Sequence, residues 1–258
     1  MIEEVYRPAS PDEAVAVKER EGAVYLAGGT QVNWVPSGMN PAKAVLLAGL
    51  LPNDVTRREN GWEIGAGITL QDLVDAPEAP AVLRRAASMI PARCVRNMAT
   101  LGGNIAANRT DSYLLPALIA LGAEVETVER GVLSVEAYIT GGEDALITRV
   151  RLPKTRGACV VDRVVRSSAA LPTLTLGVRV AEGEAVIALG CVAPKVTRLR
   201  EVEVRVVSGA LETETTVFRA VFDSIDPPAG LKESAAYRRY ITATMVARAV
   251  TACRKQRG

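Results

Sequence analysis

Two segments of the chain combine adjacent glycines with residues that donate hydrogen bonds. They consist of Ala27, Gly28, Gly29, Thr30 and Gln31, and of Thr100, Leu101, Gly102, Gly103 and Asn104. Glycine lets the main chain approach a ligand closely and lets consecutive N–H groups point the same way. A concave group of N–H donors binds phosphate oxygens, and the threonine and asparagine side chains add further donors. The two segments together predict a pair of loops that bracket a diphosphate.

The alternative for either segment alone is a tight turn that ends a strand and binds nothing. Neither segment matches the G-x-G-x-x-G pattern of dinucleotide-binding folds or the Walker pattern. The sequence therefore does not indicate a Rossmann or P-loop protein, and only the two segments taken together indicate a ligand.

Histidine is absent from all 258 residues. Its absence excludes Ser-His-Asp and Cys-His nucleophilic catalysis, histidine-ligated metals and a flavin linked through histidine. Cys94, Cys159, Cys191 and Cys253 lie far apart without a C-x-x-C pair, so we expect reduced core thiols rather than a zinc or iron–sulfur site. We predict no metal site and no catalytic side chain, with a cofactor that carries the chemistry.

Charge and hydropathy favour a cytoplasmic protein that binds neither nucleic acid nor a membrane. The 31 basic and 29 acidic residues leave a net charge of only +2, and the basic C-terminal residues are expected to be solvated. The acidic beginning lacks the order of a signal peptide, and the longest apolar stretch, at residues 44–51, is too short to span a bilayer.

Capped helices and short strands are expected along the first 155 residues. Ser10, Pro11 and Glu13 predict a helix start, with serine at the N-cap and proline in the first turn. The apolar patterns predict strands at residues 23–27, 44–47 and 62–67, separated by a polar turn at 53–60. Further helices are expected to begin at Thr69 and to cover residues 79–89 and 112–122.

A loop-like composition at residues 153–157 predicts a domain boundary. We expect a first domain at 1–155, with subdomains at about 1–55 and 56–155, and a second domain at 156–258. The second domain should contain strands at 174–180 and 185–189 and then two helical segments, the last from about Ser234 to Arg254. Strands followed by helices predict an α+β fold.

Several motifs, in order and spacing, resemble the FAD-binding domain of molybdenum hydroxylase medium subunits, the family of xanthine dehydrogenase and carbon monoxide dehydrogenase. They are LAGGT at 26–30, IGAGIT at 64–69, RNMATLGGNIA at 96–106, LPAL at 115–118 and LGAEV at 121–125. The stretch SAAYRR at 234–239 resembles the tyrosine–arginine signature of the family's C-terminal domain. The resemblance thus covers nearly the whole chain.

The resemblance implies two subdomains of the vanillyl-alcohol oxidase (PCMH) type, a small three-stranded C-terminal domain with helices, and non-covalently bound FAD. Arg163 falls where relatives often carry a lysine near the flavin, with a surface salt-bridging arginine as the alternative. Leu171 falls where an apolar residue guards the isoalloxazine face. The implied cofactor-binding residues are Ala27, Gly28, Gly29, Thr30, Gln31, Val32, Thr100, Leu101, Gly102, Gly103, Asn104, Tyr113, Ile147, Arg163 and Leu171.

One stretch departs from the family pattern. Relatives usually continue the second glycine segment with Ser-Pro and then an aspartate before the helix, whereas this chain has Arg109, Thr110 and Tyr113. Asp111 is a possible substitute, so the contacts to the ribose and adenine stay open. The link at 126–134 leaves no room for the iron–sulfur loop that some relatives insert there.

The implied function is electron transfer within a complex of a molybdenum-cofactor subunit, an iron–sulfur subunit and this chain. Electrons from substrate hydroxylation would reach the flavin through partner clusters and pass to NAD or another acceptor. One alternative is a stand-alone flavin reductase of the same fold, although that reaction requires a proton donor and a different substrate-binding domain. The other alternative is a non-enzymatic nucleotide-binding or assembly module. The sequence does not specify the oxidised substrate.

Overall fold

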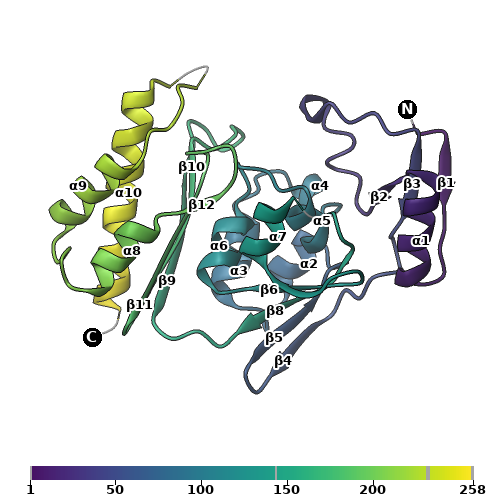
Figure 1. The fold of residues 1–258 in the computed structure, drawn as a ribbon, viewed down its shortest axis with the longest axis horizontal. Coiled ribbons are helices and arrows are strands. Elements are labelled where there is room, and N and C mark those ends of the chain that lie inside the picture. Colours follow the sequence, from purple (N-terminus) through teal and green to yellow (C-terminus); the bar gives the residue numbers. More distant parts are fainter. Residues whose placement is uncertain (1, 143, 231–232, 257–258) are drawn as a thin grey trace. The chain divides into compact units, whose positions relative to one another are not determined.

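The computed structural model describes residues 2–142, 144–230 and 233–256. Its helices and strands form two compact units, which confirms the α+β prediction (Figure 1). The first unit comprises Met1–Ala79, Ala92–Ala107 and Glu124–Leu152. The second comprises Pro80–Pro91, Asn108–Ala123 and Pro153–Gly258.

A parallel three-stranded sheet begins the first unit. Its order is β1 (Glu4–Tyr6), β3 (Lys43–Leu46) and β2 (Val24–Leu26). Helix α1 (Pro11–Glu21) joins β1 to β2, and the Ser10 side chain caps it by accepting from the Glu13 N–H at 3.1 Å. Gly22 ends this helix at a φ of 61°, so the predicted helix start and its proline are confirmed.

A five-stranded sheet forms the rest of the strand framework in this unit. In order across the sheet the strands are β4 (Val55–Arg58), β5 (Gly61–Gly65), β8 (Ile147–Pro153), β6 (Glu124–Thr127) and β7 (Gly131–Ser134). The prediction of a polar turn at 53–60 was wrong. Its polar residues form edge strand β4, because they pair with β5 in an antiparallel hairpin.

The first unit also contains short helices. They are η1 (Val35–Ser37), α2 (Leu70–Asp75), α4 (Arg93–Arg96), α5 (Leu101–Ala106) and α7 (Val135–Gly141). Thr69 caps α2 by accepting from the Asp72 N–H at 3.0 Å, as the sequence predicts. Strands β6 and β7 form a tight hairpin, so the link at 126–134 is short as expected.

The second unit is built on a four-stranded antiparallel sheet. Its order is β12 (Thr197–Arg198), β11 (Glu184–Gly190), β10 (Leu174–Ala181) and β9 (Ala158–Val164). Helices α8 (Arg200–Val207), α9 (Glu214–Ser224) and α10 (Ala235–Lys255) follow it, and α3 (Ala81–Ser88) and α6 (Leu114–Ala120) belong to the same unit. We expected three strands and two helical segments in the C-terminal part of the chain. Its described residues form four strands followed by three helices. The two-residue strand β12 and the short helix α8 were missed because they lack clear periodicity.

The sheet of the second unit lies between two helical layers (Figure 1). Alternate β10 side chains, including Leu176 and Val178, pack with Val246 and Val250 of α10 in one apolar core. On the other face, a Cβ at Gly177 would lie 2.2 Å from the Pro116 carbonyl oxygen, so glycine lets α6 approach the sheet closely. The division into two units therefore places two segments of the predicted 1–155 domain, Pro80–Pro91 and Asn108–Ala123, in the second unit. Their helices pack with the sheet of that unit.

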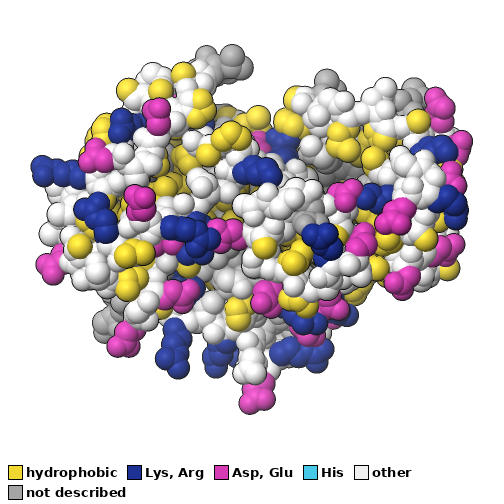
Figure 2. Space-filling model, viewed as in Figure 1, with side chains coloured by type: hydrophobic (Ala, Val, Ile, Leu, Met, Phe, Trp, Pro, Cys, Tyr) yellow, Lys and Arg dark blue, Asp and Glu magenta, His cyan; other side chains and the backbone are white. Residues whose placement is uncertain are grey.

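Within the described residues, no helix is both long and apolar enough to cross a membrane. On the face drawn in Figure 2, Lys and Arg side chains are interspersed with Asp and Glu.

Candidate cofactor site

The first glycine segment forms an open loop directly after β2. Gly29 has a φ of 70°, a left-handed conformation that favours glycine. The loop carbonyls are in use, because Gly29 accepts from the Asn33 N–H at 3.0 Å and Gln31 accepts from the Trp34 N–H at 3.3 Å. Among the described residues, none receives a hydrogen bond from the consecutive N–H groups of Gly28, Gly29, Thr30, Gln31 and Val32.

The second glycine segment is the beginning of α5 rather than an open loop. Its N–H groups are hydrogen bonded: Leu101 donates to Ile68 at 3.0 Å, and Gly102 donates to Ala66 at 2.9 Å. Thr100 is the N-cap and accepts from the Gly103 N–H at 3.1 Å through its hydroxyl. The expectation of a second array of available N–H donors was therefore wrong, while a cofactor contact of these residues stays a prediction.

The fold brings the two glycine segments together inside the first unit. A Cβ at Gly28 would lie 1.6 Å from the Met98 carbonyl oxygen, so glycine is required for the first loop to reach the chain just before α5. A Cβ at Gly103 would lie 4.0 Å from that of Ala27. Segments far apart in the sequence thus form one continuous backbone surface.

Chain packing explains three of the four glycines. Gly28 needs room for Met98, Gly29 needs its positive φ, and a Cβ at Gly102 would lie 2.8 Å from that of Ala66. Gly103 differs, because its Cβ would meet only the Thr100 hydroxyl within 3.4 Å, at 2.8 Å, and the residue is exposed. Its open Cα leaves a surface that a ligand can contact and that a larger side chain would fill.

The turn after β5 supports the second segment. Thr69 forms an isolated antiparallel bridge with Thr100, and the Leu70 N–H donates to the Ala99 carbonyl at 2.8 Å. A Cβ at Gly65 would lie 2.1 Å from the Pro52 carbonyl oxygen. The motif at 64–69 therefore positions α5 by close backbone packing. Sequence analysis missed the supporting role of Ala66 and Met98, for which only the neighbouring glycines were a signal.

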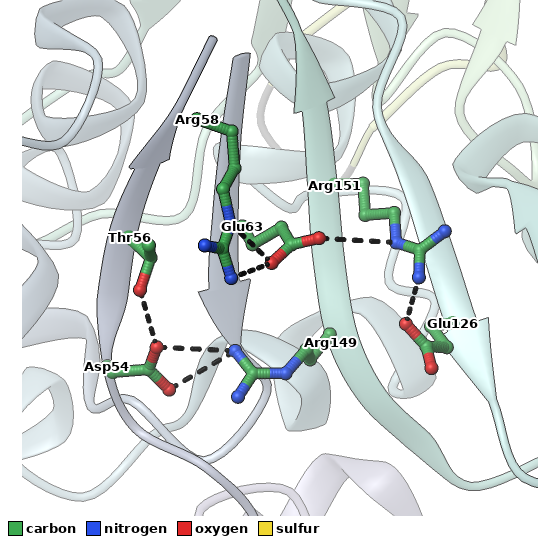
Figure 3. A network of polar contacts seen from close by, with 7 residues as sticks. All are labelled: Asp54, Thr56, Arg58, Glu63, Glu126, Arg149 and Arg151. Carbon is green, nitrogen blue, oxygen red and sulfur yellow. Dashed lines mark hydrogen bonds and ion pairs between the residues drawn. The ribbon is translucent and has the colours of Figure 1, made fainter. Parts of the chain in front are cut away.

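A charged network covers one face of the five-stranded sheet that includes β5 (Figure 3). Its ion pairs are Arg58–Glu63 at 2.7 Å, Arg151–Glu126 at 2.6 Å, and Arg149–Asp54 at 3.2 Å, with Arg151 also 4.0 Å from Glu63. The Arg58 side chain is the principal cause that lowers the pKa of Glu63. Exposed pairs of this kind contribute little each, so the network supports the sheet rather than forming a binding site.

Ile147 and Val32 complete the predicted residues of the first unit. Ile147 begins β8 and is buried in the core, whereas Val32 lies half-buried in the turn after the first glycine loop.

The other predicted residues, Tyr113, Arg163 and Leu171, belong to the second unit. Arg163 donates from Nη1 to the Met89 carbonyl, and its guanidinium lies 5.3 Å from the centroid of the Tyr113 ring. It forms no ion pair with any described residue, so the alternative of a salt-bridging arginine finds no carboxylate partner among them. Its position near a flavin stays a prediction. Leu171 is 65% exposed in the loop between β9 and β10.

The stretch that departs from the family pattern is anchored within the second unit. Arg109 binds both carboxylate oxygens of Asp111, at 2.8 and 2.5 Å, so Asp111 already has an ion-pair partner within this unit. Thr110 accepts from the Cys191 N–H through its carbonyl at 3.0 Å and donates from its hydroxyl to Ala193 at 2.8 Å. Burial raises the pKa of Tyr113, and Arg163 partly opposes that shift.

Two of the cysteine thiols have strongly raised pKa values. Burial raises the pKa values of Cys159 and Cys191 to about 12, so both thiols stay protonated and weakly nucleophilic near neutral pH. No group of three or more Cys, Asp or Glu side chains suited to a metal ion occurs in the described part of the chain.

The family described as "FAD binding domain in molybdopterin dehydrogenase" matches residues 1–155, which contain both glycine segments. The chain belongs to this family. The resemblance drawn from the motifs is therefore confirmed, and FAD is the cofactor of the family.

A curated relative of this FAD-binding family is the Escherichia coli (strain K12) "Uncharacterized protein YgfM". It is 37% identical over 259 residues, which cover 99% of this chain and 98% of that protein.

Two solved structures share the fold across almost their whole chains. A chain of quinoline 2-oxidoreductase from Pseudomonas putida 86 matches with a TM-score of 0.85 at 19% identity, over 99% of this chain and 98% of that chain. A chain of carbon monoxide dehydrogenase from Hydrogenophaga pseudoflava matches with a TM-score of 0.84 at 24% identity, over 98% of this chain and 97% of that chain. These likenesses establish the α+β fold of both units.

Proposed function

We propose that the chain is the FAD-binding electron-transfer subunit of a molybdenum hydroxylase. The observation that carries the proposal is the row of five N–H groups from Gly28 to Val32, which have no acceptor among the described residues. Buried or half-buried backbone donors are usually satisfied, so five in a row indicate a ligand. Consecutive N–H groups around a left-handed glycine suit the charged oxygens of a diphosphate.

Each glycine segment has a separate role in this proposal. The first loop binds the pyrophosphate with its N–H groups and the Thr30 hydroxyl. The second segment holds that loop in place through Met98 and offers the open Cα of Gly103 to the cofactor. FAD, when bound, supplies two-electron redox chemistry, and the protein positions the ring and adjusts its potential.

The ring-side assignments are proposals of the same kind. Arg163 is a cation already held by the Tyr113 ring and the Met89 carbonyl. Placed at the pyrimidine edge, such a cation stabilises an anionic reduced ring. Leu171 supplies exposed apolar surface for a ring face. The non-covalent character of binding agrees with the absence of histidine from the chain.

The assembly is proposed to contain a molybdenum-cofactor subunit and an iron–sulfur subunit in the cytoplasm, with NAD or another molecule as acceptor. The organisation proposed for this chain is an FAD-binding domain at 1–155 and a C-terminal domain at 156–258. The described residues offer no metal-binding group, so substrate hydroxylation is assigned to the partners.

Purification of the full chain tests the proposal. We expect about one FAD per chain, visible by absorption near 450 nm and released completely by acid or heat. Alone, the chain should only transfer electrons from NADH to a dye, and oxidation of an organic substrate should need the partner subunits. Flavin retained by the precipitated chain, FMN in place of FAD, or hydroxylation by the isolated chain would contradict the proposal.

A further inference from the structure

An aromatic cluster lies at the surface of α9 and α10. Both phenylalanines of the chain and two of its six tyrosines belong to these helices. Phe218 and Phe222 stack with centroids 5.7 Å apart, and the Tyr240 ring meets Phe218 edge-on at 5.6 Å. Tyr237 and Tyr240 are 46% and 55% exposed. Figure 2 shows hydrophobic side chains at the surface around the beginning of α10, at the upper left.

Helix α10 carries a one-sided charge. It contains five cations and no Asp or Glu across Ala235–Lys255. Three of these cations serve the fold by donating to backbone carbonyls: Arg238 to Pro228, Arg239 to Phe222, and Arg254 to Glu212. None of the five pairs with a carboxylate of the described residues.

The remaining two cations of the helix are available to a partner. Arg248 and Lys255 are both exposed. They lie seven residues apart and therefore on the same face of α10. Helix α9 adds the charged residues Glu214, Arg219 and Asp223, which change the total by only one negative charge. The two helices together thus keep a clear positive excess beside the aromatic cluster.

We propose that the α9–α10 face, marked by Phe218, Tyr237, Tyr240, Arg248 and Lys255, binds an acidic segment of a partner subunit. Exposed tyrosines supply the apolar anchors that dominate protein–protein interfaces, and arginine is enriched beside them. Opposite charge steers such a partner and fixes its register. The inference rests on the proposed function, because the partner is a subunit of the proposed complex.

Site-directed photo-crosslinking tests the face in the assembled complex. The full chain is co-expressed with its molybdenum-cofactor and iron–sulfur subunits, with p-benzoylphenylalanine replacing Tyr240 or, as the control, Val132. Val132 lies in the first unit and is 44% exposed. We expect the probe at position 240 to attach to an Asp- and Glu-rich segment of a partner subunit, and the probe at position 132 to give no such product.

Substitution gives a second measurement. Tyr240→Ala should raise the dissociation constant for the partner subunits by about tenfold. Arg248→Glu with Lys255→Glu should raise it by roughly 10–100-fold and reduce its dependence on salt. Arg57→Glu with Lys154→Glu is the matched reversal at two exposed cations elsewhere, and it should leave the dissociation constant within about twofold. Circular dichroism shows that each variant is folded.

The outcomes separate the two claims. Full assembly with the α9–α10 variants, or attachment of the position-240 probe to a second copy of this chain or to a basic segment, would overturn the inference and leave the proposed function standing. A wild-type chain that forms no complex with these subunits would overturn both.

Discussion

The two glycine segments look alike in sequence but differ in what their backbones do. After β2, five consecutive N–H groups have no acceptor among the described residues. At the start of α5, the N–H groups donate to Ala66, Ile68 and Thr100. A Gly-Gly pair thus leaves backbone donors available in one place and begins a closely packed helix in the other. The neighbouring backbone makes the difference. The turn after β5 supplies carbonyl acceptors for the N–H groups at the start of α5, whereas no described residue supplies them for the first segment.

The largest loss of FAD affinity is expected from Gly28→Ala, which should push the first glycine loop away from the chain before α5. A Cβ 1.6 Å from the Met98 carbonyl must displace the loop. Overpacking costs about 1–3 kcal/mol of unfolding free energy. Two lost charge-assisted bonds to phosphate, roughly 1.5–3 kcal/mol each, weaken FAD binding by about two to four orders of magnitude. Titration of the apoprotein with FAD measures the loss.

Gly131→Ala is the control for Gly28→Ala. Gly131 has a positive φ, of 66°, whereas Gly28 does not, and nothing lies within 4 Å of a Cβ added at Gly131. This variant should lose about 1 kcal/mol of stability through strain and keep its FAD affinity. Equal affinities of the two folded variants would show that the contact with Met98 does not organise the site.

Gly103→Val should have the next largest effect, a loss of about 10–100-fold in FAD affinity. A single bulky side chain would fill the open surface there, but the Gly103 N–H already donates to Thr100, so no phosphate bond is lost directly. FAD titration of the folded variant, against Gly131→Val, measures it. Unchanged affinity would remove the second segment from the cofactor site.

Thr30 and Thr100 are expected to have different roles, the first in FAD binding and the second in helix capping. Thr30 has no hydrogen-bond partner among the described residues, so Thr30→Val should weaken FAD binding about tenfold without loss of stability. Thr100 caps α5, so Thr100→Val should cost about 1 kcal/mol of unfolding free energy and change the affinity little. Denaturant unfolding and FAD titration of both variants give the comparison. The reverse pattern would mean that the roles of the segments are exchanged.

Arg163→Met extends the comparison from the phosphates to the ring. Removing a cation that contributes about 1–2 kcal/mol to the reduced form should lower the two-electron midpoint potential by roughly 20–40 mV. Tyr113→Phe, which keeps the ring beneath the guanidinium, should leave the potential near that of the parent. Redox titration with reference dyes measures both, and an unchanged potential in Arg163→Met would place Arg163 away from the flavin.

The smallest expected effect is on the stability of the protein at low pH, through carboxyl groups beside the two sheets of the first unit. Arg20, Lys43 and Tyr6 hold the pKa of Glu21 at about 2, and Arg58 and its neighbours lower that of Glu63. A carboxyl with a lowered folded pKa stabilises the protein above its unfolded value of 4.5, and this contribution is lost as the pH falls toward the folded value. The thermal midpoint should therefore fall slightly between pH 4.5 and 2.

Glu21→Gln should reduce the fall of the thermal midpoint between pH 4.5 and 2. Glu182→Gln should not reduce it, because Glu182 has no ion pair with any described residue. Differential scanning at a series of pH values makes the measurement. An identical fall in all three proteins would mean that neither carboxyl governs it.

Local chemistry made several elements predictable. The Ser10 cap with Pro11 began α1 where expected, and Thr69 began α2, because a capping side chain satisfies N–H groups of its own helix. Edge strand β4 and the short helix α8 were missed, because a pairing partner or packing surface outside the segment stabilises them. The motifs were enough to indicate an FAD-binding family, which the match over residues 1–155 confirms.

What the sequence alone determined was the family, the α+β class, and the residue types able to meet a diphosphate. Tertiary structure decided which backbone donors stay available. Ala66 and Ile68 accept from N–H groups of the second segment, whereas no described residue accepts from the N–H groups of residues 28–32 in the first. Tertiary structure also assigned the segments Pro80–Pro91 and Asn108–Ala123 to the unit of the C-terminal sheet. The physical reason is that a backbone N–H is identical in every non-proline residue, so its availability depends on the acceptor that the fold places opposite it.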